Sequence, residues 1–130
     1  MSHPAVLVVE DQILIRLNAL DFVSAAGFEG IDATNADDAV RILKARADIS
    51  IVFTDIEMPG SMDGLKLAHY ISERYPKVRV IVTSGKAIIK DIQLPVGHKF
   101  YSKPYDEEEI VGEMKRMISG IGSGSREIRL

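Results

Sequence analysis

The sequence contains no cysteine, which excludes disulfide bonds, thiolate nucleophiles and cysteine-bound zinc. It also lacks any apolar run near the roughly 20 residues that a membrane-spanning helix needs. The first four residues carry no basic segment of the kind that opens a secretory signal. With 16 basic and 19 acidic residues, the formal net charge is only −3, which gives no electrostatic footprint for nucleic acid. We therefore expect a soluble, cytoplasmic protein with neither a membrane nor a nucleic acid as its partner.

Short apolar segments rich in β-branched residues recur along the chain. They cover Ala5–Val9, Ile51–Thr54 and Val78–Thr83, and such runs are typical of strands buried on both faces of a parallel sheet. Glu29–Ala33 and Lys99–Ser102 are weaker strand candidates. The 130 residues, 46% of them apolar, suffice for one domain with a hydrophobic core. We therefore expect five strands in a single sheet.

Helical patterns separate the predicted strands. Asn35, Asp63 and Asp106 are positioned to cap three helices, the last with Glu109 three residues further on. The segment Lys86–Pro95 leaves room for only about two helical turns, so the fourth helix is expected to be short or irregular. The apolar stripe predicted for the first helix consists of Ile13, Leu17, Leu20 and Val23, and that for the last helix of Ile110, Met114 and Met117.

Strand and helix alternate five times along the chain. This order predicts an α/β fold with right-handed βαβ connections, in which helices cover both faces of a doubly wound, five-stranded parallel sheet. We expect the domain to occupy residues 4–119. Residues 119–130 contain three glycines and three serines, a composition typical of a flexible end, so residues 120–130 are predicted to be a flexible C-terminal tail.

Ligands of open parallel sheets bind at the carboxyl ends of the strands, so the residues that follow each strand are candidate site residues. Three carboxylates within a few ångströms would repel one another, by about 4 kcal/mol per pair at 4 Å and an effective dielectric constant near 20. Mg²⁺ prefers oxygen ligands and often shares them with phosphoryl groups, so it would relieve this repulsion. The candidate residues at these strand ends are Glu10, Asp11, Asp55, Thr83 and Lys103. Together, these side chains favour phosphoryl transfer to a carboxylate.

Five motifs, four of them at these strand ends and one at a predicted helix start, resemble the receiver domain of two-component response regulators. Each motif alone is weak, whereas five in the family's order across one domain are highly specific. The resemblance implies a flavodoxin-like fold and a signalling module that catalyses its own phosphorylation and dephosphorylation, not a metabolic enzyme. The motifs are Val8-Val9-Glu10-Asp11, Phe53-Thr54-Asp55-Ile56-Glu57-Met58-Pro59, Met62-Asp63-Gly64, Val82-Thr83-Ser84-Gly85 and Lys103-Pro104-Tyr105.

The resemblance also implies how the acidic residues act. Asp55 corresponds to the residue that takes a phosphoryl group from a histidine kinase or a histidine phosphotransfer protein. Glu10 and Asp11 correspond to the acidic pair that binds Mg²⁺ together with Asp55, and Glu57 contributes its backbone carbonyl as a further metal ligand. These assignments imply that phosphorylation depends on Mg²⁺ or another divalent cation.

Further residues correspond to the parts that sense the phosphoryl group. Lys103 matches the family's lysine, with a cis Lys103–Pro104 peptide bond, and Thr83 matches the switch hydroxyl. Phe100 matches the switch aromatic residue, and because Phe100 and Tyr101 alternate along a strand, we expect one in the core and the other more exposed. The implied output is contact with an unknown downstream protein, by a monomer or a phosphorylation-dependent dimer.

Three departures from the commonest family pattern bear on function. The stretch from Thr83 to Lys103 is a little short, so the fourth helix, which often contributes to the family's output surface, is expected to be reduced or irregular. The loop between Met58 and Gly64 carries one additional residue, and no effector domain follows, which favours a stand-alone receiver. Two alternatives stay open. A small Mg²⁺-dependent phosphatase with an aspartyl nucleophile would generally carry aspartate where Glu57 stands. A receiver-like module that signals without phosphorylation would have no reason to keep like charges clustered.

The three histidines lack ligand spacing and are interpreted as surface or satisfied residues.

Overall fold

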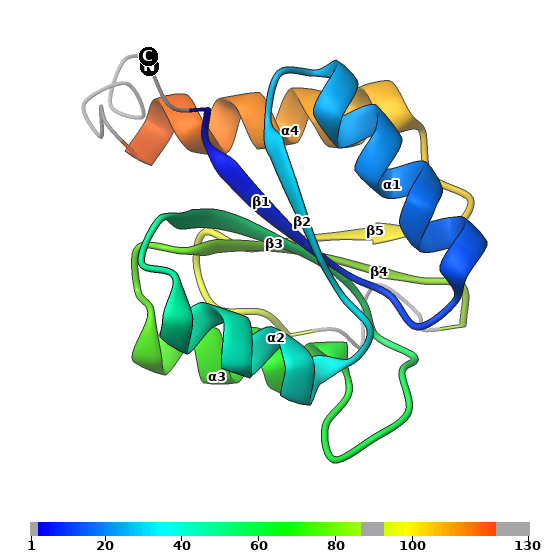
Figure 1. Ribbon diagram of the computed structural model, residues 1–130, viewed down its shortest axis with the longest axis vertical. Helices are drawn as coiled ribbons and strands as arrows, with labels where there is room; N and C mark the ends of the chain where they lie inside the picture. The colour runs from blue at the N-terminus through cyan, green and yellow to red at the C-terminus, as the bar shows by residue number, and fades with distance from the viewer. Residues whose placement is uncertain (1–2, 87–92, 122–130) are drawn as a thin grey trace.

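The β-branched runs form the buried strands of one parallel sheet in the computed structural model, which describes residues 3–86 and 93–121 (Figure 1). Its five strands follow the order β2-β1-β3-β4-β5, which confirms the predicted doubly wound, flavodoxin-like α/β fold. The strands are β1 (Ala5–Val9), β2 (Glu29–Ala33), β3 (Ile49–Asp55), β4 (Arg79–Ser84) and β5 (Lys99–Ser102). The helices are α1 (Ile13–Ala25), α2 (Ala36–Ala45), α3 (Gly64–Arg74) and α4 (Glu107–Ile121).

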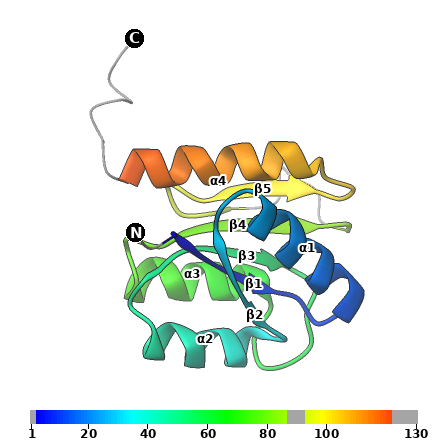
Figure 2. The ribbon, with the colours of Figure 1, turned by 45° about the horizontal axis from the view of Figure 1, so that its top comes forward.

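The helices form two layers with the sheet between them. α1 and α4 cover one face and α2 and α3 the other (Figures 1 and 2). Alternate residues of each strand point to opposite faces: Val6 and Val8 join the core beneath α1 and α4, whereas Leu7 and Val9 join the core beneath α2 and α3. All four side chains, which belong to β1, are at most 1% exposed, so this inner strand is inaccessible from either face.

Two predicted helix caps are confirmed, and a third takes a different form. Asn35 Oδ1 accepts a hydrogen bond from the Asp38 backbone N–H at 2.8 Å, and Asp63 Oδ1 accepts one from the Lys66 N–H at 2.9 Å. Asp106 Oδ1 instead accepts from the Glu108 N–H at 2.9 Å. Each of these bonds satisfies a backbone donor that the first helical turn leaves free, at a benefit of about 1 kcal/mol.

The predicted inner face of α1 is wrong in part. Ile13 and Leu17 are 59% and 52% exposed, and Leu14 is 78% exposed, whereas the fully buried residues of the helix are Ala19 and Val23. The helix carries large apolar residues around most of its circumference, so apolar spacing alone could not select the side that packs on the sheet. The result is an apolar outer surface at the start of α1.

Other boundaries differ slightly from the sequence expectations. β3 begins two residues earlier and ends one residue later than predicted, and β4 is shifted by one residue, because pairing with neighbouring strands extends each run. α4 continues to Ile121, beyond the domain end placed at 119. Residues 87–92 of the predicted fourth helix and residues 122–130 of the predicted tail lie outside the described residues. None of the described helices is long and apolar enough to cross a membrane.

Candidate functional site

The register of the parallel strands brings the predicted site residues to one edge of the sheet. Asp55 at the end of β3 pairs directly with Thr83 of β4. Val9 of β1 pairs with Thr54, so Glu10 follows one step beyond its strand, beside Asp55. Lys103 follows the last pair between β4 and β5 and donates its backbone N–H to the Ser84 carbonyl at 2.9 Å. Residues up to 93 positions apart in the chain thus converge on one edge.

Asp55 is a buried carboxylate with one oxygen engaged and the other free. Its side chain is 5% exposed, and its Oδ2 accepts a hydrogen bond from Lys103 Nζ at 3.0 Å. Its Oδ1 is buried and has no hydrogen-bond partner among the residues that the structure describes. Burial raises the pKa of Asp55, and the hydrogen bond and charge of Lys103 oppose that rise. A buried, unpartnered carboxylate oxygen is costly, so it marks a place for a ligand.

Glu10 adds a second buried carboxylate to this edge. Its Oε2 accepts a hydrogen bond from the Gln12 backbone N–H at 3.0 Å. Burial raises the pKa of Glu10, and the nearby charge of Asp55 raises it further. Asp11, the other member of the predicted acidic pair, is exposed. The clustering of like charges that the sequence predicted is therefore present between Glu10 and Asp55, with Asp11 at the solvent side.

These residues fit a magnesium ion. Across residues 3–86 and 93–121, no three acidic or histidine side chains form a ready-made metal cluster. Mg²⁺ does not require one, because proteins commonly hold it by one or two carboxylates and leave several waters in its shell. Glu10 and Asp55 supply two neighbouring carboxylates, and Asp55 Oδ1 supplies the unpartnered oxygen. The Glu57 carboxylate is engaged through its Oε2, which accepts a hydrogen bond from Ser84 Oγ at 2.5 Å, and the backbone carbonyl of Glu57 stays the predicted ligand.

Gly64 supports Asp55 from behind, a role that the sequence reasoning missed. It is the first residue of α3, and its N–H donates to the Ile56 carbonyl at 3.0 Å. A Cβ atom on Gly64 would lie 2.0 Å from the Asp55 carbonyl oxygen and 2.7 Å from its carbonyl carbon. Only glycine permits this approach. The signal that could have revealed it was the place of Gly64 in the motif Met62-Asp63-Gly64.

The model of the response regulator receiver domain family matches residues 6–115. The chain belongs to this family. Receiver domains accept phosphoryl groups, generally bind Mg²⁺ at such an acidic pocket, and interact with histidine kinases or phosphotransfer proteins and with downstream effectors.

Similar proteins agree with this assignment. The chain is 33% identical over 120 residues to a putative response regulator NtrX-like protein of Rickettsia bellii, an alignment that covers 89% of this chain and 25% of that protein. It is 29% identical over 135 residues to the aerobic respiration control protein ArcA of Escherichia coli, across 99% of this chain and 56% of ArcA. A receiver domain structure from Methanospirillum hungatei superposes with a TM-score of 0.85 at 19% identity, over 95% of this chain and 99% of that one. The chain thus spans about a quarter to just over half of these curated relatives.

The two switch candidates of this receiver domain lie on opposite faces of the sheet. Thr83 is buried beside Asp55, and its Oγ1 donates to the Thr54 carbonyl at 3.5 Å. Phe100 packs against the core beneath α2 and α3, whereas Tyr101 packs against the core beneath α1 and α4. The expectation that one of the two aromatic residues lies in the core and the other is more exposed is wrong, because neither is fully buried and neither is exposed. Both are half-buried, because both faces of β5 contribute to a core.

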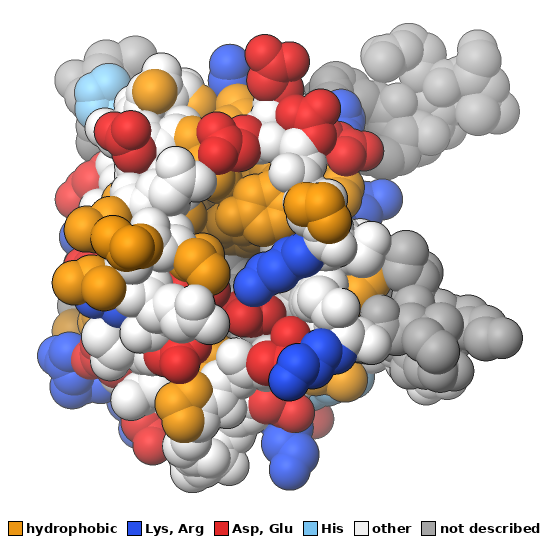
Figure 3. Space-filling view, turned by 90° about the vertical axis from the view of Figure 1, so that its right-hand side faces the viewer, with side chains coloured by type: hydrophobic (Ala, Val, Ile, Leu, Met, Phe, Trp, Pro, Cys, Tyr) orange, Lys and Arg blue, Asp and Glu red, His pale blue; other side chains and the backbone are white. Residues whose placement is uncertain are grey.

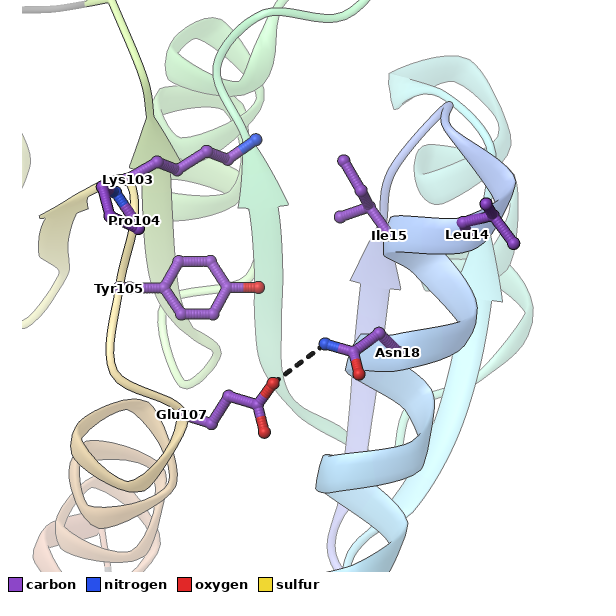
Figure 4. Close-up of a pocket in the computed structure, with 7 residues that line it drawn as sticks. All are labelled: Leu14, Ile15, Asn18, Lys103, Pro104, Tyr105 and Glu107. Carbon is purple, nitrogen blue, oxygen red and sulfur yellow. Dashed lines mark hydrogen bonds between the residues drawn. The ribbon is translucent and has the colours of Figure 1, made fainter.

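A pocket of about 560 Å³ opens beside the site between α1 and the connection from β5 to α4. Lys103 and Tyr105 extend from this connection toward α1, and Asn18 Nδ2 donates to Glu107 Oε2 across the gap at 2.9 Å (Figure 4). The Lys103–Pro104 peptide bond is cis, as predicted. The Tyr105 ring packs edge-on against two phenylalanines, and burial raises its pKa to about 12. Tyr105 is therefore a neutral, fixed wall of the pocket.

Proposed function

We propose that this receiver domain takes a phosphoryl group from a phosphohistidine of a histidine kinase or phosphotransfer protein onto Asp55. The observation that carries the proposal is the carboxylate of Asp55, which has one oxygen on Lys103 and one buried oxygen without a partner among the described residues. A carboxylate held in this way by a neighbouring cation is suited to act as a nucleophile toward phosphorus.

The transfer conserves atoms and charge in a single displacement. An oxygen of Asp55 forms a bond to phosphorus while the bond between phosphorus and the donor imidazole nitrogen breaks, and the electron pair of that bond returns to the ring. The product is an acyl phosphate. Lys103 is placed to stabilise the charge on the phosphoryl oxygens, and Thr83 offers a hydroxyl donor next to Asp55. Mg²⁺ bound by Glu10, Asp11, Asp55 and the Glu57 carbonyl would neutralise further charge.

Dephosphorylation completes the cycle that we propose. Water attacks the phosphorus of the acyl phosphate, which releases inorganic phosphate and restores the Asp55 carboxylate. The phosphorylated form would differ from the free form in the positions of Thr83 and Phe100 and would bind a downstream protein differently. The protein is then a signalling module in which phosphorylation changes a binding surface, not a metabolic enzyme.

The surface around the site supports a protein donor. Figure 3 faces the carboxyl edge of the sheet and shows hydrophobic side chains around and within a hollow, with acidic and basic side chains beside it. The exposed apolar residue Leu14 of α1 lines the pocket that Lys103 also lines, and Ile13 and Leu17 of the same helix are exposed as well. A donor that delivers a phosphohistidine to Asp55 would cover these residues, and exposed apolar patches commonly mark protein interfaces.

The nucleophile is tested by labelled phosphotransfer from a phosphorylated histidine kinase, with acetyl phosphate as a small-molecule donor. Wild type should accept about one phosphoryl group per chain, and Asp55→Asn should accept none from either donor. Asp48→Asn is the matched control. Asp48 is exposed and pairs with Arg46, and it lies just before β3, at the end of the strand away from Asp55. Phosphorylation of Asp55→Asn, or sustained multiple-turnover hydrolysis of a phosphomonoester by wild type, would overturn the proposal.

The donor surface is tested separately with Leu14→Glu. Leu14 is 78% exposed, so the substitution should leave the fold and the reaction with acetyl phosphate unchanged. Transfer from the kinase should slow at least about tenfold, because a charge in an apolar interface opposes docking. Equal rates of transfer from the kinase to both proteins would show that the start of α1 does not contact the donor.

A further inference from the structure

Arg16 makes a contact that the chemistry of the site does not itself require. It lies on α1, and its side chain is only 12% exposed, which is unusual for an arginine on a surface helix. Its Nη1 donates a hydrogen bond to the backbone carbonyl of Glu10 at 2.9 Å. Its Nε lies 3.2 Å from Asp32 Oδ2 of β2, although this pair does not meet hydrogen-bond geometry. The directed bond of Arg16 is therefore the one to Glu10.

The Glu10 carbonyl belongs to the peptide group that joins Glu10 to Asp11. A peptide group is planar, so a fixed carbonyl oxygen also fixes the direction of the Asp11 N–H and the positions of both flanking Cα atoms. On its other side, the Glu10 N–H donates to the Ala33 carbonyl of β2 at 3.0 Å. The turn that carries both acidic side chains is thus held at two points, one from β2 and one from Arg16.

A simpler reading is that Arg16 only joins α1 to β2 through Asp32. That reading explains the ion pair but not the bond to the site. Asp32 is 52% exposed, and ion pairs with an exposed partner contribute little to stability. The bond to Glu10 is short, directed and partly buried, and it ends on the peptide group that joins Glu10 and Asp11, the predicted acidic pair of metal ligands. The geometry therefore favours a role in placing those ligands.

We propose that Arg16 is a positioning residue for the divalent cation. By fixing the peptide between Glu10 and Asp11, it holds both carboxylates where they bind the ion together with Asp55. This inference rests on the magnesium site of the proposed function. Residues that orient metal ligands without touching the metal typically change its affinity 10-fold to 100-fold when they are replaced, and we expect Arg16 to belong to that group.

The test compares Mg²⁺ affinity in three variants of the full chain, by calorimetric titration and by thermal melting across Mg²⁺ concentrations. Arg16→Met keeps the apolar stem of the side chain and removes the donors, and it should weaken Mg²⁺ binding at least about tenfold. Asp32→Asn is the matched control, because it removes the ion pair and leaves the bond from Arg16 to Glu10 in place. It should change the affinity less than about twofold.

Arg16→Lys provides a second readout, and it serves the test if Arg16→Met does not fold. A lysine ammonium can donate to the Glu10 carbonyl but cannot reach Asp32 at the same time. Arg16→Lys should therefore bind Mg²⁺ more tightly than Arg16→Met. If Arg16→Met does not fold, Arg16→Lys should bind Mg²⁺ within about threefold of the wild-type affinity. Equal affinities of wild type and Arg16→Met, or equal losses in Asp32→Asn and Arg16→Met, would overturn the inference. Loss of the full affinity in Arg16→Lys would also overturn it. No Mg²⁺ binding by wild type would instead refute the metal site of the proposed function.

Discussion

The contact between Gly64 and the backbone of Asp55 permits a sharp prediction. Gly64→Ala would place a Cβ atom 2.0 Å from the Asp55 carbonyl oxygen, and ordinary contacts begin at 3.4 Å. Either α3 or the end of β3 must therefore move by about 1.4 Å. Overpacking of this kind costs about 1–3 kcal/mol, and because both neighbours are backbone we expect about 3 kcal/mol. For a domain of this size that corresponds to a decrease of about 10 °C in Tm.

The displacement should also impair the reaction. A misplacement of about 1 Å at a reacting group can lower a rate about 100-fold, so the folded fraction of Gly64→Ala should accept phosphoryl groups from acetyl phosphate about 100 times more slowly. Gly85→Ala is the control, because its Cβ would lie 3.8 Å from Lys103 Cβ, an ordinary contact. Thermal melting and labelled phosphorylation measure both effects. A Gly64→Ala protein as stable and as reactive as Gly85→Ala would refute the reasoning.

Three further predictions concern charge. Mg²⁺ at ten times its Kd should stabilise wild type by about 1.4 kcal/mol, and melting curves of Asp11→Asn should lose most of that gain. Lys103 lowers the pKa of Asp55, so in Lys103→Met a carboxyl NMR titration should find that pKa higher than in wild type. Burial lowers the pKa of His98 to about 4, so the protonation of unfolded chains should reduce stability as the pH falls from about 6.5 to 4. His98→Asn, which keeps an acceptor for the Val80 N–H, should flatten that decline in denaturant titrations.

The edge of the sheet that carries the site was largely predictable because it depends on strand order and strand ends. Buried parallel strands have a strong local signal, and their carboxyl ends must lie together. The sequence therefore predicted that Asp55, Thr83 and Lys103 would meet, and the structure brings them together. The caps at Asn35 and Asp63 were predictable for a similar reason, because a capping side chain bonds a backbone N–H only two or three residues away.

Features that depend on contacts between distant segments were not predictable in the same way. The inner face of α1 was misassigned because its apolar residues surround the helix, so the choice depends on which side chains fit β1 and β2. The packing of Tyr101 depends on α4, where Glu113 Oε1 accepts a hydrogen bond from the Tyr101 hydroxyl at 3.5 Å. Gly64 and Arg16 act through backbone atoms of Asp55 and Glu10. Contacts of that kind leave no periodic pattern in a sequence.

The positions of Thr83 and Phe100 constrain how a phosphorylation signal can leave the site. Thr83 lies on the face of the sheet that Asp55 shares with α1 and α4, whereas Phe100 packs on the opposite face. A signal from Asp55 to Phe100 must therefore pass through the sheet. β4 provides the route, because Val82, the neighbour of Thr83, pairs with Phe100 in the ladder and packs in the same core. A displacement of the Thr83 backbone toward a phosphoryl group necessarily moves Val82 as well. The end of β4 is thus the element through which chemistry on one face can change packing on the other.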